Sequence, residues 1–293
     1  MGKSSGFFLI HNYNTVPDDL LQYCTEYLIM DVSDDPEVAA KLREREDKRI
    51  LFLQNTGHNL TSYFTYFAEN LDSLPEVLFL LKGNIIGRHV SAEYFERTLH
   101  NTWFTYLYEE RFMRARYSRP TKEMLQENGG KDISEGSIAN LLTECQFTEE
   151  NSSWYMQTGT HPCRYFSTYD ALLQFIYVDP VLPKVIAFAP GGCYIVRGDQ
   201  VRQHGKAFYR NLNKLMNYTL EPGFPAEAYI IERMMPLFFE SNYRVQPWME
   251  DENLFDEKIR EVEAQNKELE KQREEKQNSF MGRVKQTLKR VKG

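Results

Sequence analysis

Four short apolar runs constrain the fold of this chain more than any other feature. They occupy residues 7–10, 27–30, 50–53 and 77–81, and segments of helical character lie between them. Each run is continuous instead of alternating with polar residues, which is typical of strands that are buried on both faces. The pattern predicts an α/β fold in which helices flank a mostly parallel sheet.

Polar residues follow each of the four predicted strands. Ligands of parallel sheets bind outside the carboxyl ends of the strands, so we predict a binding site at this edge. Any one of these polar segments alone could be an ordinary turn, and the prediction rests on all four together. The residues in question are His11, Asn12, Tyr13, Asp31, Asn55, Gly57, His58, Asn59, Lys82, Gly83 and Asn84.

Length, charge and cysteine content narrow the class of protein. The 293 residues suffice for one large domain, which we place at residues 1–248. A formal net charge of −7 argues against a nucleic-acid-binding protein. The four cysteines lack metal-binding spacing and are expected to be reduced thiols.

Because the N-terminus carries no signal peptide or membrane span, we expect a cytoplasmic protein. P-loop, G-x-S-x-G and H-E-x-x-H motifs are absent.

Two carboxylates interrupt an apolar helix that is predicted over residues 226–239. Glu227 and Glu232 stand five positions apart, and a carboxylate on an apolar helix is costly unless it is paired or used. Either residue is a candidate general base that deprotonates an acceptor hydroxyl, with Glu227 ranked first. The structural alternatives are a helix-start acid at Glu227 and an ion pair between Glu232 and either Arg233 or another neighbouring basic group.

The C-terminal part of the chain has a different composition from the rest. Residues 249–278 are rich in charged helix-forming residues, and a break is predicted at Asn278 and Ser279. Residues 279–293 contain basic but no acidic residues, and apolar residues recur at helical spacing. This tail is typical of an amphipathic helix on an anionic membrane surface. A solvated tail is the alternative, and the apolar seam is too broken to predict a coiled coil.

Four further elements are predicted from periodicity. Helices are expected over residues 91–108 and 200–217, and short strands over residues 185–188 and 193–196. The two strands flank a Gly191–Gly192 pair, which lacks the spacing of a dinucleotide fingerprint.

Several stretches of the chain carry recognisable motifs. An asparagine–glycine turn precedes a helix with Tyr63, an Asn-Leu-Asp-Ser-Leu-Pro turn follows, and the next strand ends in Lys82–Gly83. Matching segments recur at residues 191–196, 208–209 and 229–233. Together they resemble an uncharacterised domain family that is similar to the GT-A (Rossmann-like) glycosyltransferases. The resemblance spans residues 7–240.

The resemblance implies a nucleotide-sugar donor site at the ends of the first two strands, where Asp31 would meet the base or ribose. It also implies a carboxylate near the acceptor, at the position of Glu227 or Glu232. Two departures stand out. GT-A enzymes usually carry a metal-binding Asp-x-Asp where this chain has residues 82–84, and the family has a carboxylate where this chain has Asn59. Lys82 could replace the charge of the metal, although a bound manganese or magnesium ion is also compatible.

We therefore expect an inverting glycosyltransferase that modifies a surface polysaccharide or a lipid-linked glycan. The sequence leaves open whether it works without a metal ion. The tail would place it peripherally on an anionic membrane, without any nucleic-acid partner. A non-catalytic domain that binds a nucleotide or glycan is one alternative. A scaffold recruited through its C-terminal helix is another, and a homo-oligomer stays open.

Overall fold

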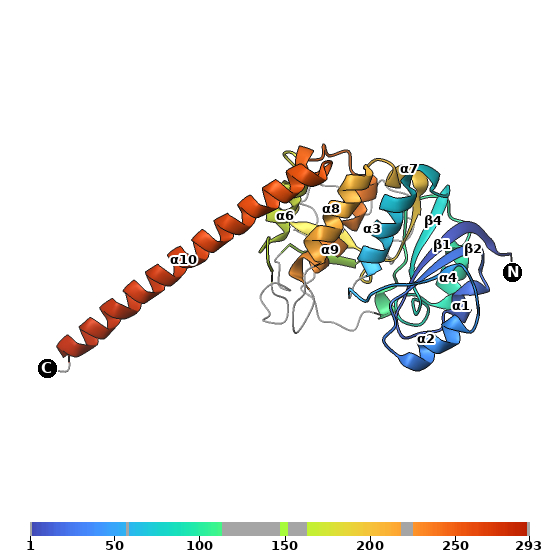
Figure 1. The fold of residues 1–293 in the computed structure, drawn as a ribbon, viewed down its shortest axis with the longest axis horizontal. Coiled ribbons are helices and arrows are strands. Elements are labelled where there is room, and N and C mark those ends of the chain that lie inside the picture. The colour runs from blue at the N-terminus through green and yellow to red at the C-terminus, as the bar shows by residue number, and fades with distance from the viewer. Residues whose placement is uncertain (1, 57–58, 113–146, 152–162, 218–224, 292–293) are drawn as a thin grey trace.

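The computed structural model describes residues 2–56, 59–112, 147–151, 163–217 and 225–291, without the side chains of residues 110 and 279–291. An α/β body carries a long C-terminal helix, α10 (Glu252–Val291), that projects away from it (Figure 1). In the described part of the chain, no helix is both long enough and apolar enough to cross a membrane.

The main sheet has six strands in the order β3-β2-β1-β4-β8-β5. The four apolar runs form its parallel part, as predicted: β1 (Ser4–Asn12), β2 (Cys24–Asp31), β3 (Ile50–Phe52) and β4 (Val77–Lys82). Strand β8 (Tyr194–Arg197) pairs antiparallel with both β4 and β5 (Thr105–Tyr106). A mostly parallel α/β sheet flanked by helices is therefore confirmed.

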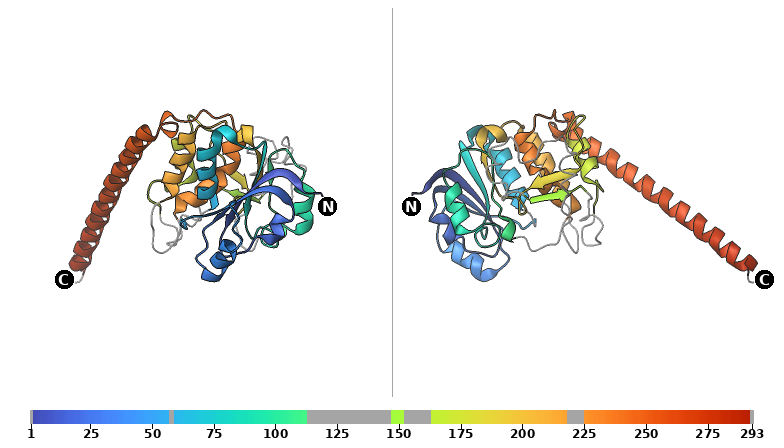
Figure 2. Two further views of the ribbon diagram at one scale, coloured as in Figure 1. Left: turned by 45° about the vertical axis from the view of Figure 1, so that its right-hand side comes forward. Right: turned by 180° about the vertical axis from the view of Figure 1, so that it is seen from behind.

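Helices cover both faces of this sheet (Figure 2). On one face α3 (Asn59–Asn70), α8 (Lys206–Met216) and α9 (Ala226–Glu240) pack in an aromatic core that includes Phe64, Phe67 and Tyr209. On the other face α1 (Asp18–Leu21), α2 (Pro36–Arg43) and α4 (Ala92–Thr98) contribute to a smaller core. Side chains of Asp35 and Ser91 accept hydrogen bonds from the first turns of α2 and α4, which fixes where these helices begin.

A second, two-stranded sheet lies beside α9. Strand β6 (Phe147–Glu150) pairs antiparallel with β7 (Val185–Phe188), and α6 (Tyr169–Ile176) packs nearby against α9. The two strands predicted at 185–188 and 193–196 both exist, but they belong to different sheets as β7 and β8. The turn at Gly191 and Gly192, both with positive φ, carries the chain from one sheet to the other.

Three predicted element boundaries are wrong. The helix predicted over 91–108 ends at Thr98, because Thr105 and Tyr106 pair with β8 as a strand. The helix predicted over 200–217 is interrupted at Gly205, which separates α7 (Gly198–Val201) from α8. The break predicted at 278–279 is absent, since α10 continues to Val291. Asparagine and serine cost a helix only about 0.5 kcal/mol each, which does not suffice to end it.

Candidate functional site

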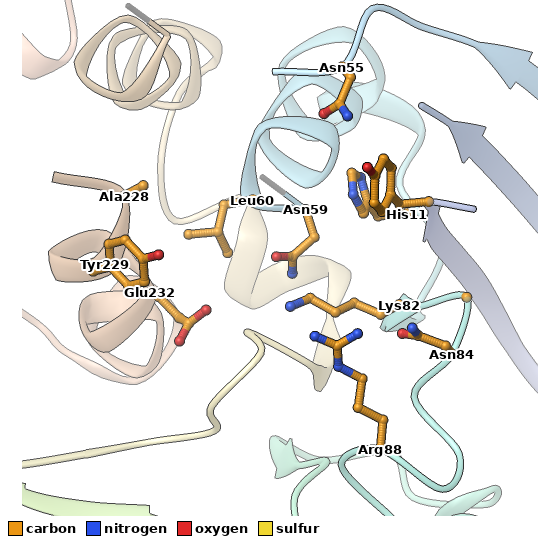
Figure 3. Close-up of a pocket in the computed structure, with 12 residues that line it drawn as sticks. His11, Asn55, Asn59, Leu60, Lys82, Asn84, Arg88, Ala228, Tyr229 and Glu232 are labelled. Carbon is orange, nitrogen blue, oxygen red and sulfur yellow. The ribbon is translucent and has the colours of Figure 1, made fainter. Parts of the chain in front are cut away.

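A cavity of about 480 Å³ opens at the carboxyl ends of β1 and β4, between the sheet, the start of α3 and α9 (Figure 3). The chain runs from β1 outward to β2 and β3 and then returns to the other side of β1 as β4. Such a reversal of strand order creates a crevice in which α/β proteins bind ligands. The cavity is lined by His11, Tyr13, Asn55, Asn59, Leu60, Lys82, Gly83, Asn84, Arg88, Ala228, Tyr229 and Glu232.

One wall of the cavity is cationic. Lys82 ends β4, Arg88 follows in the next loop, and both side chains extend toward the middle of the cavity (Figure 3). Among the described residues, neither has a carboxylate within ion-pair distance. The start of α3, at Asn59, lies on the same cavity and adds the partial positive charge of a helix N-terminus. This wall is therefore suited to an anion.

The positive charges of this wall also affect the pKa of the neighbouring residue, His89. Burial, reinforced by the positive charges of Lys82 and Arg88, lowers the pKa of this imidazole to about 3. The ring is thus neutral at physiological pH, and its Nε2 atom is buried without a hydrogen-bond partner among the residues that the structure describes. The charge of this wall consequently comes from Lys82 and Arg88 rather than from the histidine.

Gly83 allows the β4 loop to approach the end of β1 closely. A Cβ atom at this position would lie 2.2 Å from Oδ1 of Asn12 and 2.7 Å from Oγ1 of Thr15. Any larger residue would therefore push the loop, and Lys82 with it, away from β1. In the sheet, Lys82 is the register partner of His11, whose Nδ1 lies 2.9 Å from Oγ of Ser62.

Asn12 and Asp31, both predicted to touch the donor, form a buried frame behind the cavity and are not among its lining residues. Asn12 donates to Oδ1 of Asp31 (2.8 Å) and to the carbonyl of Thr15 (2.7 Å). Ser33 also donates to Asp31 (2.7 Å). Both residues are less than 3% exposed, so they position the strand-end loops instead of meeting a ligand directly.

Tyr13 and Asn55 also line the cavity. The ring of Tyr13 is 45% exposed, and its hydroxyl donates to Oδ2 of Asp34 (3.0 Å), which raises the pKa of the phenol. Asn14 also bonds Asp34, with Nδ2 donating at 2.6 Å. The two strand-end loops are thereby tied together, and an exposed aromatic ring is held at the rim of the cavity.

Helix α9 forms the opposite wall, with Ala228, Tyr229 and Glu232 on the cavity. The Glu232 carboxylate points across the cavity toward the wall of Lys82 and Arg88 (Figure 3). The predicted alternative, an ion pair between Glu232 and Arg233, is wrong. Arg233 pairs instead with Glu149 of β6, and both side chains are almost fully buried.

Glu227, ranked first as the general base, lies outside this cavity. It is fully buried, and its Oε1 accepts backbone hydrogen bonds from Arg164 (3.0 Å), Tyr165 (2.7 Å) and Phe166 (3.2 Å). A carboxylate with three backbone donors holds the 164–166 segment against α9. Of the two candidate bases, the structure thus places only Glu232 on the cavity.

The Gly191–Gly192 turn packs against the start of α3. Asn59 donates from Nδ2 to the carbonyl of Gly191 (2.9 Å). A Cβ atom on Gly192, which has φ +63°, would lie 2.9 Å from Leu60 and 3.1 Å from Nδ2 of Asn59. The amide of Asn59 is therefore a structural link between α3 and the turn before β8.

The structure brings together most of the predicted donor-site residues, because His11, Tyr13, Asn55, Asn59, Lys82, Gly83 and Asn84 all line one cavity. Gly57 and His58 lie outside the described residues. Sequence reasoning missed Leu60, Arg88, Ala228 and Tyr229. Helical spacing could have found Ala228 and Tyr229, since both precede Glu232 by one turn. Arg88 follows β4 in an irregular loop, so no periodicity marks it.

The cavity lining supplies one carboxylate and one imidazole, from Glu232 and His11. No group of three His, Cys, Asp or Glu side chains suited to a metal ion occurs in the described part of the chain. Comparison of the chain with models of known protein families, with curated proteins and with solved structures gives no match.

Proposed function

We propose that this protein is a glycosyltransferase that binds a nucleotide-sugar donor in the cavity. The observation that carries the proposal is the opposite charge of two facing cavity walls. Two cations and a helix N-terminus face a carboxylate across a cavity at the sheet's topological switch point. A donor of this class presents a diphosphate to the cations and a sugar carbon to the space between the walls. The motif resemblance to GT-A enzymes supports the same class.

The diphosphate would lie against Lys82 and Arg88, with the first turn of α3 beside it. Charge-assisted hydrogen bonds from a guanidinium and an ammonium group are strong contacts for phosphate oxygens. The exposed ring of Tyr13 offers a flat apolar surface at the rim for the nucleoside. Because Asp31 is hydrogen-bonded within the protein, the proposal gives it a positioning role only.

Glu232 would act as the general base. Its carboxylate takes the proton of an acceptor hydroxyl while the hydroxyl oxygen bonds the anomeric carbon of the sugar. The bond from that carbon to the diphosphate oxygen breaks in the same step. The leaving diphosphate keeps the electron pair, and Lys82 and Arg88 stabilise its charge. A single displacement inverts the anomeric configuration. We infer a glycan acceptor, either a surface polysaccharide or a lipid-linked glycan.

A non-catalytic binding domain is the second candidate, and one observation favours it. The residues at 82–84, Lys-Gly-Asn, lack the Asp-x-Asp expected of GT-A enzymes. In this case the cavity would bind a nucleotide without turnover, or the body would serve as a scaffold. The two candidates share the anion-binding wall and differ in whether Glu232 has a catalytic role.

Thermal unfolding with UDP, GDP, CDP and dTDP, each with and without manganese, tests the shared part of the proposal. A ligand at a hundred times its Kd stabilises a protein by about 2.7 kcal/mol, so one nucleotide should raise the Tm clearly. Lys82→Met and Arg88→Met should each reduce the shift, while Lys41→Met on the exposed surface of α2 serves as the matched control. If no nucleotide shifts the Tm, the proposal fails.

Turnover separates the two candidates. Once the binding nucleotide is known, a sugar donor that carries this nucleotide should be hydrolysed or transferred by the wild-type protein. Glu232→Gln should lower kcat by roughly a hundredfold or more while leaving nucleotide binding intact. Nucleotide binding without any turnover by the wild type would support the binding domain instead.

A further inference from the structure

The long helix α10 has two parts that differ in what they touch. Its first turns are docked on the body: Phe255 is 1% exposed, and Ile259 and Val262 pack against the main core. Glu263 pairs with Arg164 at 2.8 Å, and Asn266 donates to the carbonyl of Tyr165 at 2.9 Å. These contacts fix the base of the helix and the direction in which it leaves the body.

Beyond Asn266 the helix leaves the body. Every residue from 267 to 278 is exposed, and Figures 1 and 2 show the helix projecting alone. Helices of this kind are only marginally stable in water, because an isolated helix gains nothing from tertiary packing. The helical backbone nevertheless continues through Val291. Residues 267–278 of α10 therefore have no packing partner in the described part of the chain, which suggests that another surface stabilises this helix.

Charge is segregated along this helix. Residues 267–278, which we call the bare segment, contain four basic and four acidic residues and are neutral. Residues 279–293, which we call the tip, contain five basic residues and no acidic one. Because the whole chain has a net charge of −7, the other 278 residues carry −12. The basic tip thus stands at the end of an otherwise acidic protein.

The bare segment separates the basic tip from the acidic body. Twelve helical residues span about 18 Å, roughly twice the screening length of about 8 Å at physiological salt. The acidic body therefore does not neutralise the tip. Within the tip, positions 280, 284, 288 and 291 fall on one side of a helix, and Phe, Val, Leu and Val occupy them. The tip combines apolar residues with a net positive charge.

We propose that α10 is an arm whose tip docks the protein on the surface of an anionic lipid bilayer. Charge complementarity selects an anionic surface, and the apolar positions select a bilayer, because insertion into lipid adds to the attraction of the basic residues. A second copy of α10 fits the exposed helix less well than a bilayer does. Leu269 is the last apolar residue before position 280, so no continuous seam runs along the exposed helix.

Co-sedimentation of the full-length protein with vesicles tests the proposal. Vesicles of phosphatidylcholine mixed with phosphatidylserine should bind the protein, and binding should weaken as salt is raised. Vesicles of phosphatidylcholine alone should bind it at least about tenfold less. Equal binding to both compositions would overturn the role of charge. Light scattering that shows a dimer broken by deletion of residues 267–293 would assign the arm to a second copy instead.

Two variants with the same change in charge localise the contact. The tip variant replaces four basic residues with glutamine: Arg283→Gln, Lys285→Gln, Lys289→Gln and Arg290→Gln. The matched control replaces the four basic residues of the bare segment: Lys267→Gln, Lys271→Gln, Arg273→Gln and Lys276→Gln. We expect the tip variant to lose binding by at least about tenfold and the control to keep it. Equal losses would mean diffuse attraction and would refute docking by the tip.

A third variant tests whether apolar residues enter the bilayer. Phe280→Ser together with Leu288→Ser should also weaken vesicle binding, because it removes apolar side chains without changing charge. Circular dichroism should show the same Tm for the body in all variants, since the tip lies beyond every docked residue of α10. Unchanged vesicle binding by the serine variant would refute a lipid-inserted tip and leave only surface attraction to phosphate groups.

Discussion

At the scale of single residues, two glutamates on one helix differ in what surrounds them. Glu227 is fully buried and accepts three backbone N–H groups. Glu232, five positions later, borders the cavity and faces Lys82 and Arg88 (Figure 3). Buried polar groups that lose their partners cost about 1–3 kcal/mol each, whereas a half-exposed carboxylate without a partner costs little to remove. The first glutamate therefore has a structural role, whereas the second is placed where a ligand in the cavity would contact it.

Alanine at each position separates these roles. Glu227→Ala should lower the free energy of unfolding by about 3 kcal/mol, because three backbone donors lose their acceptor. Glu232→Ala should change it by less than about 1 kcal/mol while abolishing turnover. Urea unfolding of both variants provides the measurement. Equal stability losses would contradict the assignment, and so would turnover that survives in Glu232→Ala.

At the scale of elements, the second sheet is tied to α9 by a buried ion pair. Arg233 and Glu149 are 4% and 1% exposed, and the guanidinium also lies 4.6 Å from the centre of the Phe188 ring. Such a pair is weak evidence for net stability, but removing one partner leaves a charge buried without compensation. Since Glu232 of the cavity wall is the residue before Arg233 on α9, this pair also helps to hold that wall in place.

Removal of one partner or of both should therefore have different effects. Glu149→Ala should destabilise the protein by about 3–5 kcal/mol, because it leaves the Arg233 guanidinium without its carboxylate. The double variant Glu149→Leu with Arg233→Met should recover much of this loss, since no uncompensated charge remains. Chemical denaturation of both proteins is the measurement. A double variant that is less stable than Glu149→Ala would show that the pair contributes net stability.

At the scale of the whole molecule, a buried neutral histidine, His204, makes the free energy of unfolding depend on pH. His204, in the turn before α8, is 6% exposed, stacks on Phe208 with ring centres 4.0 Å apart, and bonds the carbonyl of Phe238 (3.0 Å). Burial lowers the pKa of His204 to about 4 from an ordinary value of 6.5, against the opposing effect of the Phe238 carbonyl. The fold therefore favours the neutral ring.

The sign of the effect follows from this depressed pKa. Above pH 6.5 the ring is neutral in both states, and the stability is fully present. As the pH falls toward 4, the unfolded chain takes up the proton first, so stability is lost. At about pH 5 the loss from this group is about 2 kcal/mol. Unfolding free energies from pH 7 to 5 should fall less steeply in His204→Gln than in the wild type, and identical slopes would contradict the assignment.

The parallel sheet could be predicted from the sequence because its signal is local. Continuous apolar runs are typical of parallel strands, and the structure places all four in one parallel array, as β1 to β4. Burial on both faces was wrongly expected for the third run, because β3 is the edge strand and Leu51 and Phe52 are exposed. The polar residues after three of these runs also converge as predicted, since parallel strands end at one edge. Neighbouring residues therefore determined the strands, their direction and one side of the cavity.

The opposite wall was decided only by tertiary packing. Glu227 and Glu232 look equivalent in sequence, and Arg233 stands next to Glu232. Their surroundings differ because distant segments occupy the space around α9: the backbone of 164–166 reaches Glu227, and Glu149 takes Arg233. Arg88 likewise reaches the cavity from a loop without periodicity. Side-chain periodicity determines which face of a helix is buried, but only the packed fold decides what each buried or exposed group meets.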